Sequence, residues 1–419
     1  MAADGKSDVS LESCVIVKWP TQKAELNLTL KRMETPRRIL VYLVTEDWYF
    51  LSHRLPMALA AQRAGYEVHV ATHVASDGPA IESYGFQLHP LNWRRGSTNP
   101  LTVFGIVREV RKLYRQLAPD LVHHVALEPA IIGSLASMGL NTACLNALAG
   151  LGYVFTSRTF RARSTAAVIR MLIRTLMNRP RQAVLVQNGD DYAVIKRLGV
   201  IADRIFLIPG SGVDTDLLTP LPEPSGRVTA AFVGRLLADK GVRTLVAAHE
   251  ILTRRGRSIQ VLIAGEADRA NPASIPAEEI DSWSRTVGID LLGRVDDIRE
   301  VWRRAHIAVL PSRREGLPKS LLEAAACGRP IVATDVPGCR EIARQDQNAL
   351  LVPTDNPTEL ADALDRLAGD ADLRKRFGAA GRRLVETEFS AERVGNDTVS
   401  LYGRLLGAAA ALHVRAAHV

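Results

Sequence analysis

The sequence IAVLPSRREGLPKSLLE, residues 307–323, decides the fold class. It opens with four apolar residues, Ile307–Leu310, a short run that is typical of a buried strand. A polar loop follows, and Pro318 stands where a helix would begin, because proline is pre-organised for the first helical turn. A strand that leads through a short loop into a helix is half of a βαβ unit. This stretch therefore predicts a parallel sheet covered by helices.

The same alternation of apolar runs and amphipathic stretches recurs on both sides of this segment. The other runs expected as strands are Ile39–Val44, Glu67–Ala71, Leu121–Val125, Ala143–Asn146, Ala183–Val186, Ile205–Ile208, Val228–Val233, Ile259–Ala264, Ile289–Leu292 and Ile331–Ala333. Helices are expected around Phe50–Ala64 and over Leu101–Leu117, where apolar residues return every three or four positions. Strands that alternate with helices predict an α/β protein built from doubly wound parallel sheets.

A linker rich in proline and glycine, residues 209–226, divides this pattern into two parts of similar size. We expect a Rossmann-like domain over 36–212, a second over 213–390, and a C-terminal helix over 391–419 that packs back toward the first domain. Residues 1–35 lack a sustained period, and we expect a disordered extension or a mis-assigned start there. Ligands of such sheets bind outside the carboxyl ends of the strands, so the loops that follow the strands should carry the chemistry.

Composition and charge narrow the function. The 419 residues are 47% apolar and 23% charged, as in an ordinary folded protein. The longest uncharged run, residues 129–157, contains Asn141 and Asn146, so we expect helix, strand and loop rather than a membrane span. The four cysteines form no C-x-x-C pair, which argues against a zinc site and fits a reducing cytoplasm. Residues 36–212 hold 20 Lys and Arg against 11 Asp and Glu, and this balance of +9 indicates an anionic partner.

Two cations follow the apolar run Val228–Val233. In the sequence VGRLLADKG, residues 233–241, Gly234 permits a sharp turn, and Arg235 and Lys240 lie five positions apart on a short loop. Two cations at the end of a strand suit a pyrophosphate, because of their charge and the forked donors of arginine. A solvated basic loop would have the same residues, so this feature alone leaves both interpretations open.

Two carboxylates flank the helix start in the segment 307–323. Glu315 lies in the loop, and Glu323 lies one or two turns into the helix. The first free amides of this helix are near Lys319 and Ser320, where the helix dipole favours a phosphate. A carboxylate within the helix can accept two vicinal hydroxyls, as a ribose presents, and one just outside can hold sugar hydroxyls. Either glutamate by itself could also be a plain surface charge.

Taken together and in this order, the linker, the Arg…Lys loop and Glu-Gly-Leu-Pro with a second glutamate resemble glycosyltransferase family four, whose members are retaining GT-B enzymes. The resemblance covers about residues 37–406 and is densest over 205–342. It implies two Rossmann-like domains that face a cleft and transfer of a hexosyl or N-acetylhexosaminyl group from a nucleotide sugar, UDP being the expected nucleotide. The segments 146–157 and Gly210–Asp214 are similar to a bacterial subgroup that builds capsule, O-antigen and other lipid-linked glycans. The implied acceptor is a polyprenyl-linked or saccharide molecule.

The resemblance also implies roles for the candidate residues. Arg235 and Lys240 match the pair that neutralises the donor diphosphate. Glu315 matches the acid that contacts the donor sugar, and Glu323 matches the acid that holds the ribose. The turn glycine and the residues that open the helix complete the expected donor site: Gly234, Gly316, Leu317, Pro318 and Lys319.

The first domain departs from the family pattern. The segment Thr45–His53, TEDWYFLSH, stands where many members have a glycine-rich loop, so the amides that approach the phosphate stay undetermined. Ser211 also replaces a common asparagine in the linker motif. His124 is the candidate for the family's active-site histidine, although a histidine at a strand end is often a packed polar residue. Its neighbour His123 points to the opposite face if both lie in the strand.

These residues favour a particular mechanism. With two cations and the helix amides available, we expect no catalytic metal ion and no cofactor besides the nucleotide-sugar substrate. The sequence has no obvious D-x-D-like acidic cluster as a metal ligand and no carboxylate obviously placed as a covalent nucleophile. Front-face attack by the acceptor hydroxyl, with the leaving phosphate taking its proton, is the expected route to retention.

Three other classes of function share some of these features. A dinucleotide oxidoreductase should show G-x-G-x-x-G after the first strand, but no glycine occurs between Val44 and Gly65. A nucleic-acid-binding protein would explain the basic half, but only 5% of the residues are aromatic and no basic–aromatic strip is present. A sugar-nucleotide 2-epimerase of the GT-B fold is the nearest alternative, and release of a free 2-epimer would identify it.

Residues 158–181 predict a contact with an anionic membrane. Seven arginines occur here without any acid, at positions 158, 161, 163, 170, 174, 179 and 181. Apolar side chains recur beside them at steps of one, three and four residues: Val168, Ile169, Leu172, Ile173 and Leu176. Such a helix can lie in the interface of an anionic leaflet, which predicts peripheral and reversible attachment to the cytoplasmic face of the plasma membrane. A core helix whose arginines face water is the alternative.

Overall fold

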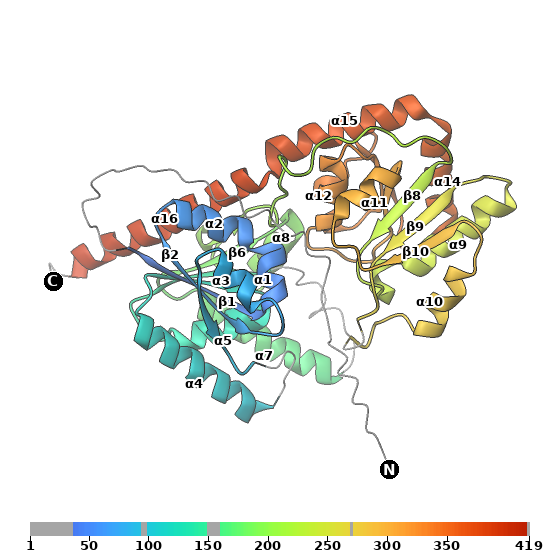
Figure 1. Cartoon of the computed structure of the whole chain (residues 1–419). Helices are drawn as coiled ribbons and strands as arrows, with labels where there is room; N and C mark the ends of the chain where they lie inside the picture. Colours follow the sequence, from blue (N-terminus) through green and yellow to red (C-terminus); the bar gives the residue numbers. More distant parts are fainter. Residues whose placement is uncertain (1–36, 94–98, 149–159, 269–270, 417–419) are drawn as a thin grey trace, which may run out of the picture.

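The computed structural model describes residues 37–93, 99–148, 160–268 and 271–416, and side chains are described through 407, with those of 160–166 excepted. The expectations for residues 1–35 and for most of the segment 146–157 lie outside these ranges. Figure 1 shows two α/β lobes, with helices on both faces of each sheet and the C-terminal helix extending from the second lobe to the first.

Each lobe contains one parallel sheet, as the sequence predicts. The first sheet has the order β3-β2-β1-β4-β5-β6-β7 and the second has the order β10-β9-β8-β11-β12-β13. Their strands are β1 Ile39–Glu46, β2 Glu67–His73, β3 Gln87–Pro90, β4 Leu121–Val125, β5 Ala143–Ala147, β6 Gln182–Val186, β7 Ile205–Leu207, β8 Thr229–Val233, β9 Gln260–Ala264, β10 Ile289–Gly293, β11 Ile307–Leu310, β12 Ile331–Thr334 and β13 Ala349–Val352. The two strands that the sequence did not predict, β3 and β13, are short edge strands.

The helices of the first lobe are α1 Asp47–His53, α2 Leu55–Arg63, α3 Gly78–Ser83, α4 Pro100–Leu117, α5 Leu127–Ala136, α7 Phe160–Met177 and α8 Gly189–Arg197. Those that follow are α9 Val242–Arg254, α10 Ala277–Ser284, α11 Ile298–Arg304, α12 Lys319–Ala326, α13 Pro337–Ile342, α14 Pro357–Gly369, α15 Ala371–Glu388 and α16 Ala391–Ala416, with 3-10 turns η1 Ala202–Arg204 and η2 Ala238–Lys240. The uncharged run of residues 129–157, which is not expected to span a membrane, forms most of α5 and all of β5. No helix within the described ranges is both long and apolar enough to cross a bilayer.

The helix expected over Phe50–Ala64 is broken into α1 and α2. Arg54 separates them with non-helical backbone angles, φ −123° and ψ −13°. Pro56 lies in the first turn of α2, and because proline has no N–H, it cannot bond to the carbonyl of Ser52 four residues earlier. The sequence pattern showed the apolar period but not this interruption, which leaves the Ser52 carbonyl available to another partner.

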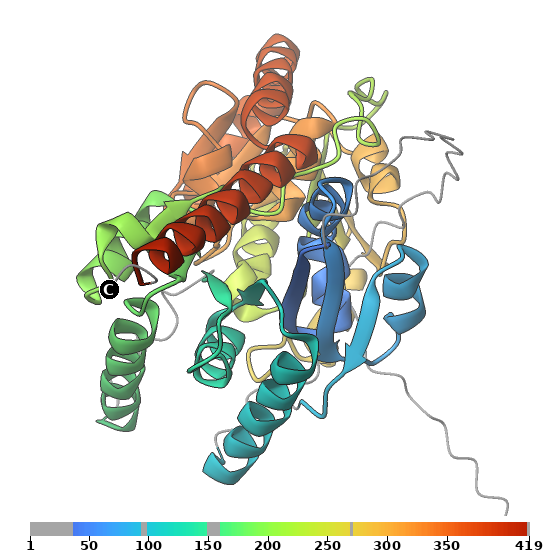
Figure 2. The ribbon, with the colours of Figure 1, turned by 90° about the vertical axis from the view of Figure 1, so that its left-hand side faces the viewer.

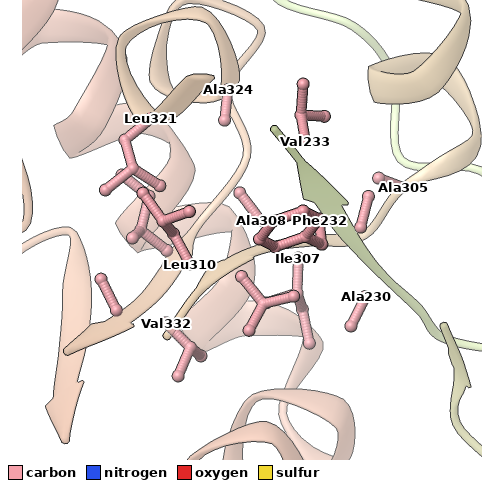
Figure 3. Packing of buried hydrophobic residues seen from close by; sticks show 14 of the residues in the cluster. Ala230, Phe232, Val233, Ala305, Ile307, Ala308, Leu310, Leu321, Ala324 and Val332 are labelled. Carbon is pink, nitrogen blue, oxygen red and sulfur yellow. The ribbon is translucent and has the colours of Figure 1, made fainter. Parts of the chain in front are cut away.

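Each lobe is stabilised by its own buried apolar side chains. In the second lobe Phe232 and Ile307, on the neighbouring strands β8 and β11, pack with Leu321 of α12 in one continuous core (Figure 3). In the first lobe the core is divided between the two faces of the sheet. One face packs against α2 and α16, where Tyr402 is fully buried and its hydroxyl bonds to that of Tyr42 at 2.8 Å.

The chain passes between the lobes twice, at adjacent places. Val213 donates its amide to the carbonyl of Phe389 (2.9 Å), and Ala391 donates to the carbonyl of Val213 (2.8 Å). Gly212 has a positive φ of +69°, and a Cβ there would lie 2.8 Å from the Cα of Ala391. From this crossing α16 runs back along α2 of the first lobe (Figure 2).

The apolar stripe expected to face a membrane is divided in the structure. Ile173 and Leu176 of α7 are buried in the core of the first lobe, and Ile169 and Leu172 are partly buried against it. Only Val168 of that stripe stays largely exposed, at 53%. Most of the stripe is therefore core, because α7 needs an apolar face to pack against α5 and the sheet.

Candidate functional site

The loop after β8 and the loop after β11 are pressed together at the carboxyl end of the second sheet. Arg313 donates its amide to the carbonyl of Asp239, at 2.9 Å. Gly241 has a φ of +71°, and a Cβ there would overlap the carbonyl of Pro311, so only glycine lets the two loops approach this closely. The approach brings residues that lie 75 positions apart in the sequence into one site.

Lys240 and Glu315 meet in this site. The Nζ of Lys240 lies 2.6 Å from Oε1 of Glu315, and the hydroxyl of Ser312 donates to the same oxygen at 2.6 Å. The Glu315 side chain is only 8% exposed. A Cβ on Gly338, at the start of α13, would lie 2.5 Å from the carbonyl oxygens of Glu315 and Gly316. The loop that carries Glu315 is therefore fixed from both sides.

Arg235 and Glu323 lie at the same carboxyl edge of the second sheet, and each has a partner of opposite charge. Arg235 pairs with Asp268 of the loop after β9, at 2.8 Å, and both side chains are partly exposed. Glu323 is 5% exposed in the second turn of α12, and its Oε1 lies 3.6 Å from Nζ of Lys319. Burial raises the pKa of Glu323, and the charge of Lys319 partly opposes that shift.

The first lobe reaches this site through the end of α1. Lys319 donates to the carbonyl of Ser52 at 3.2 Å, the carbonyl that Pro56 leaves without a helical partner. His53 follows Ser52, and its ring stacks on Tyr49 with ring centroids 4.2 Å apart. Burial, followed by the charges of Lys319, Arg54 and Lys240, lowers the pKa of His53 well below its usual value. A neutral imidazole therefore lies within electrostatic range of the two lysines.

A second contact between the lobes holds the loop that carries Glu315. Asn188, only 1% exposed, donates its side-chain N–H to the carbonyl of Gly316 at 2.9 Å. Asn188 is also the N-cap of α8, because its Oδ1 accepts from the amide of Asp191 at 2.7 Å. The cap fixes the orientation of the amide group, so its N–H is directed at Gly316.

His124 lies apart from the other predicted residues. It is fully buried inside the first lobe, where Nδ1 lies 2.8 Å from Oδ1 of Asn146 and Nε2 lies 3.1 Å from the hydroxyl of Tyr114. Burial lowers its pKa to about 4, and the bond to Asn146 opposes that shift. Of the two interpretations made from the sequence, the structure favours the packed polar residue. His123 points to the opposite face as expected, where Nδ1 lies 2.6 Å from the hydroxyl of Tyr402.

Comparisons with known proteins agree with this arrangement. The family model described as "Glycosyl transferase 4-like" matches residues 39–188, and the one described as "Glycosyl transferases group 1" matches residues 227–370. The chain belongs to the GT4-like glycosyltransferases. A relative, the N,N'-diacetylbacillosaminyl-diphospho-undecaprenol alpha-1,3-N-acetylgalactosaminyltransferase of Campylobacter jejuni, is 26% identical over 347 residues, which cover 78% of this chain and 90% of the relative.

Solved structures show the GT-B fold of this glycosyltransferase. Sucrose-phosphate synthase from Thermosynechococcus elongatus has a TM-score of 0.75 and 20% identity, over 89% of this chain and 100% of that chain. Anabaena HepE in complex with UDP and glucose has a TM-score of 0.70 and 15% identity, over 87% of this chain and 99% of that chain. The expectation of two Rossmann-like domains in a GT-B arrangement is confirmed.

The candidate site also contains residues that the sequence analysis does not single out. Asn188, Asp268 and the Ser52 carbonyl were not singled out, although Asn188 and Asp268 follow expected strands and Ser52 lies in the helix expected around Phe50–Ala64. Asn188 had a signal, because an asparagine two residues after the apolar run that ends at Val186 suggests a helix N-cap. Within the described ranges no group of three or more His, Cys, Asp and Glu side chains could hold a metal ion.

Proposed function

We propose that this glycosyltransferase moves a hexosyl or N-acetylhexosaminyl group from a UDP-sugar to a polyprenyl-linked or saccharide acceptor in surface glycan biosynthesis, with retention and without a metal ion. The observation that carries the proposal is the meeting of Lys240 with Glu315, 2.6 Å apart, beside the start of α12. The C. jejuni relative is named for a diphospho-undecaprenol-linked acceptor, and HepE was solved with UDP and glucose. Both support this choice of substrate classes.

The donor diphosphate would lie between Arg235, Lys240 and the free amides at the start of α12. As the bond to the sugar breaks, negative charge grows on the leaving diphosphate, and these fixed cations and amides stabilise it. Asp268 pairs with Arg235, and Glu315 pairs with Lys240. We expect the diphosphate to replace Asp268 as the partner of Arg235, because Arg235 lies in the more exposed pair.

The two glutamates would hold different parts of the donor. Glu315 is oriented by Lys240 and Ser312, so it can accept hydrogen bonds from sugar hydroxyls at a fixed position. Glu323 lies deeper in α12 and can accept from the two vicinal hydroxyls of the ribose. Lys319 lies between Glu323 and the first lobe, and its charge keeps a carboxylate at this buried position ionised more readily.

Retention would follow from attack on the same face that the leaving group departs from. The acceptor hydroxyl forms the new bond to the anomeric carbon as the bond to the phosphate oxygen breaks. The proton of that hydroxyl passes to the departing phosphate, so no protein base is needed. Glu315 already has a cation and a hydroxyl bound to it, which supports a role in holding the sugar rather than in covalent attack.

We also propose that the protein acts as a peripheral membrane enzyme on the cytoplasmic face of the plasma membrane, with residues 158–181 among the segments that contact the lipid. The charge of +9 over residues 36–212 supports an anionic surface as the partner. In the described part of α7 the side chains of Arg170 and Arg174 are exposed, and so is Val168. The side chains of residues 158–166 lie outside the described ones.

The proposal is tested by incubating the purified protein with a panel of nucleotide sugars, with and without EDTA. The release of the nucleoside diphosphate is followed. We expect slow hydrolysis of one or a few UDP-sugars, unchanged by EDTA, and NMR of the product should show the anomeric configuration of the donor. Release of a free 2-epimer would indicate the epimerase instead. Inversion, or dependence on a divalent ion, would contradict the mechanism.

A further inference from the structure

One face of α4 carries large apolar side chains in solvent. Leu101 is 80% exposed and Phe104 is 67% exposed, in the first turns of the helix. The next positions on the same face are Arg108, Lys112 and Arg115, all exposed, at steps of four, four and three residues. We call these five residues the α4 outer face. The opposite side of the helix packs into the core of the first lobe, where Ile106, Val110 and Tyr114 are buried.

A second exposed apolar pair lies on the same side of the first lobe. Val168 and Met171 of α7 are 53% and 58% exposed, and Arg170 and Arg174 beside them are exposed as well. Helix α5 packs against both α4 and α7 and lies between them. Figures 1 and 2 show from two directions that α4 and α7 project on the same side of the lobe.

The position of these helices relates them to the cleft. In a parallel sheet a helix begins near the carboxyl end of the strand before it. Leu101 and Phe104, in the first turns of the helix that follows β3, therefore lie toward the edge of the sheet that faces the second lobe.

We propose that the α4 outer face is the principal membrane contact of this enzyme and that its occupant is an anionic bilayer surface. Leu101 and Phe104 enter the interface between head groups and acyl chains, and Arg108, Lys112 and Arg115 bind lipid phosphates above them. Val168 and Met171 of α7 make a second, smaller contact on the same plane. The orientation turns the cleft toward the membrane, a consequence that rests on the proposed lipid-linked acceptor.

Charge and shape both favour this occupant. The charged positions of the α4 outer face are all basic, and the one acid of the helix, Glu109, points away from it and accepts from the amide of Asn92. Bulky apolar residues at one end of a basic helix face are typical of interfacial binding. A nucleic acid would be bound by the arginines but would leave Leu101 and Phe104 without a partner, since direct backbone binding uses charge alone.

The test is flotation of the full chain on vesicles of phosphatidylcholine, either alone or mixed with about 30–40% phosphatidylglycerol. The variants are L101E/F104E in α4, V168E/M171E in α7 and, as a matched control, V287E, which changes an 89% exposed valine of the second lobe. All five positions are exposed, so folding should be preserved, and UDP-sugar hydrolysis measured in parallel checks it.

We expect wild type and V287E to float on anionic vesicles in low salt. L101E/F104E should bind more weakly, by on the order of tenfold or more, because it loses the apolar area that the membrane would bury and gains two negative charges. V168E/M171E makes the same kind of change at the smaller contact, so its binding should fall less. Flotation of L101E/F104E equal to wild type would overturn the proposal, as would an equal loss in V287E. Absence of flotation for wild type would overturn it together with the membrane part of the proposed function, while intact sugar hydrolysis would leave the transfer chemistry standing.

Discussion

The two sides of the cleft are assembled by different means. On the C-terminal side charged side chains pair within one lobe, as Lys240 does with Glu315. On the N-terminal side two contacts that reach the candidate site cross between the lobes and end on backbone carbonyls, Asn188 on Gly316 and Lys319 on Ser52. The first kind persists if the cleft opens, whereas the second exists only while the lobes are together. The C-terminal side therefore supplies the charges of the candidate site, and the N-terminal side contacts their loop and helix from the other lobe.

The largest effect expected within this comparison comes from the two acids of the C-terminal side. E315Q should lower turnover by about a hundredfold or more, because the amide neither balances Lys240 nor holds the developing transition state as a carboxylate does. E323Q should act mainly on donor binding and raise the KM for the nucleotide sugar. Steady-state kinetics with donor varied at fixed acceptor separates the two. Equal changes in kcat and KM for both variants would contradict the division of roles.

A smaller effect is expected on the N-terminal side, at Asn188. N188S retains a cap for α8 but is too short to reach Gly316, so the melting temperature should stay close to that of wild type. Turnover should fall about tenfold, with little change in the affinity for UDP, because the loop that carries Glu315 loses its tether to the first lobe. N188D is the second variant, since it also caps but cannot donate. Wild-type turnover in both would show that the contact only joins the lobes.

The smallest effect is expected from Pro56. P56A restores an N–H that can bond to the carbonyl of Ser52 within the helix, and that bond would compete with Lys319. We expect a rise in donor KM of about two- to fivefold, the size of one weakened hydrogen bond, measured together with thermal unfolding. A matched change is A60G, in the same helix but away from the cleft. An identical KM shift in A60G would assign the effect to helix stability instead.

The fold was predictable because its signal is repeated. Apolar runs such as Ile307–Leu310 recur along the chain at the spacing of βαβ units, and burial on both faces of a parallel sheet requires such runs. The misses follow from the same rule. The edge strand Gln87–Pro90 is exposed or half-buried at every position, so it carries no apolar run. In α7 the period marked an apolar face but could not show whether core or lipid would cover it.

The candidate site was predictable only where its residues are near one another in the sequence. The loop and helix of residues 311–323 bring Glu315, Lys319 and Glu323 together locally, and Lys240 reaches them because β8 and β11 are neighbours. Contacts between the lobes, such as that of Asn188 with Gly316, join residues far apart in the sequence, so the residues around Asn188 do not indicate its partner. For His124 the sequence left two interpretations open, because a histidine at the carboxyl end of a strand can face a site or be directed into the core, where the structure places it.

We propose that Lys240 holds the donor diphosphate, whereas His124 supports the scaffold of the first lobe. Diphosphate release from the preferred UDP-sugar, measured for wild type, K240A and H124Q under identical conditions, tests it most directly. K240A should fold normally and lose about a hundredfold to a thousandfold in turnover, the size expected when one fixed charge that stabilises the transition state is removed. H124Q should lose stability but retain turnover within a few-fold once folded. Near-normal release by K240A, or a larger loss in folded H124Q than in K240A, would contradict the account.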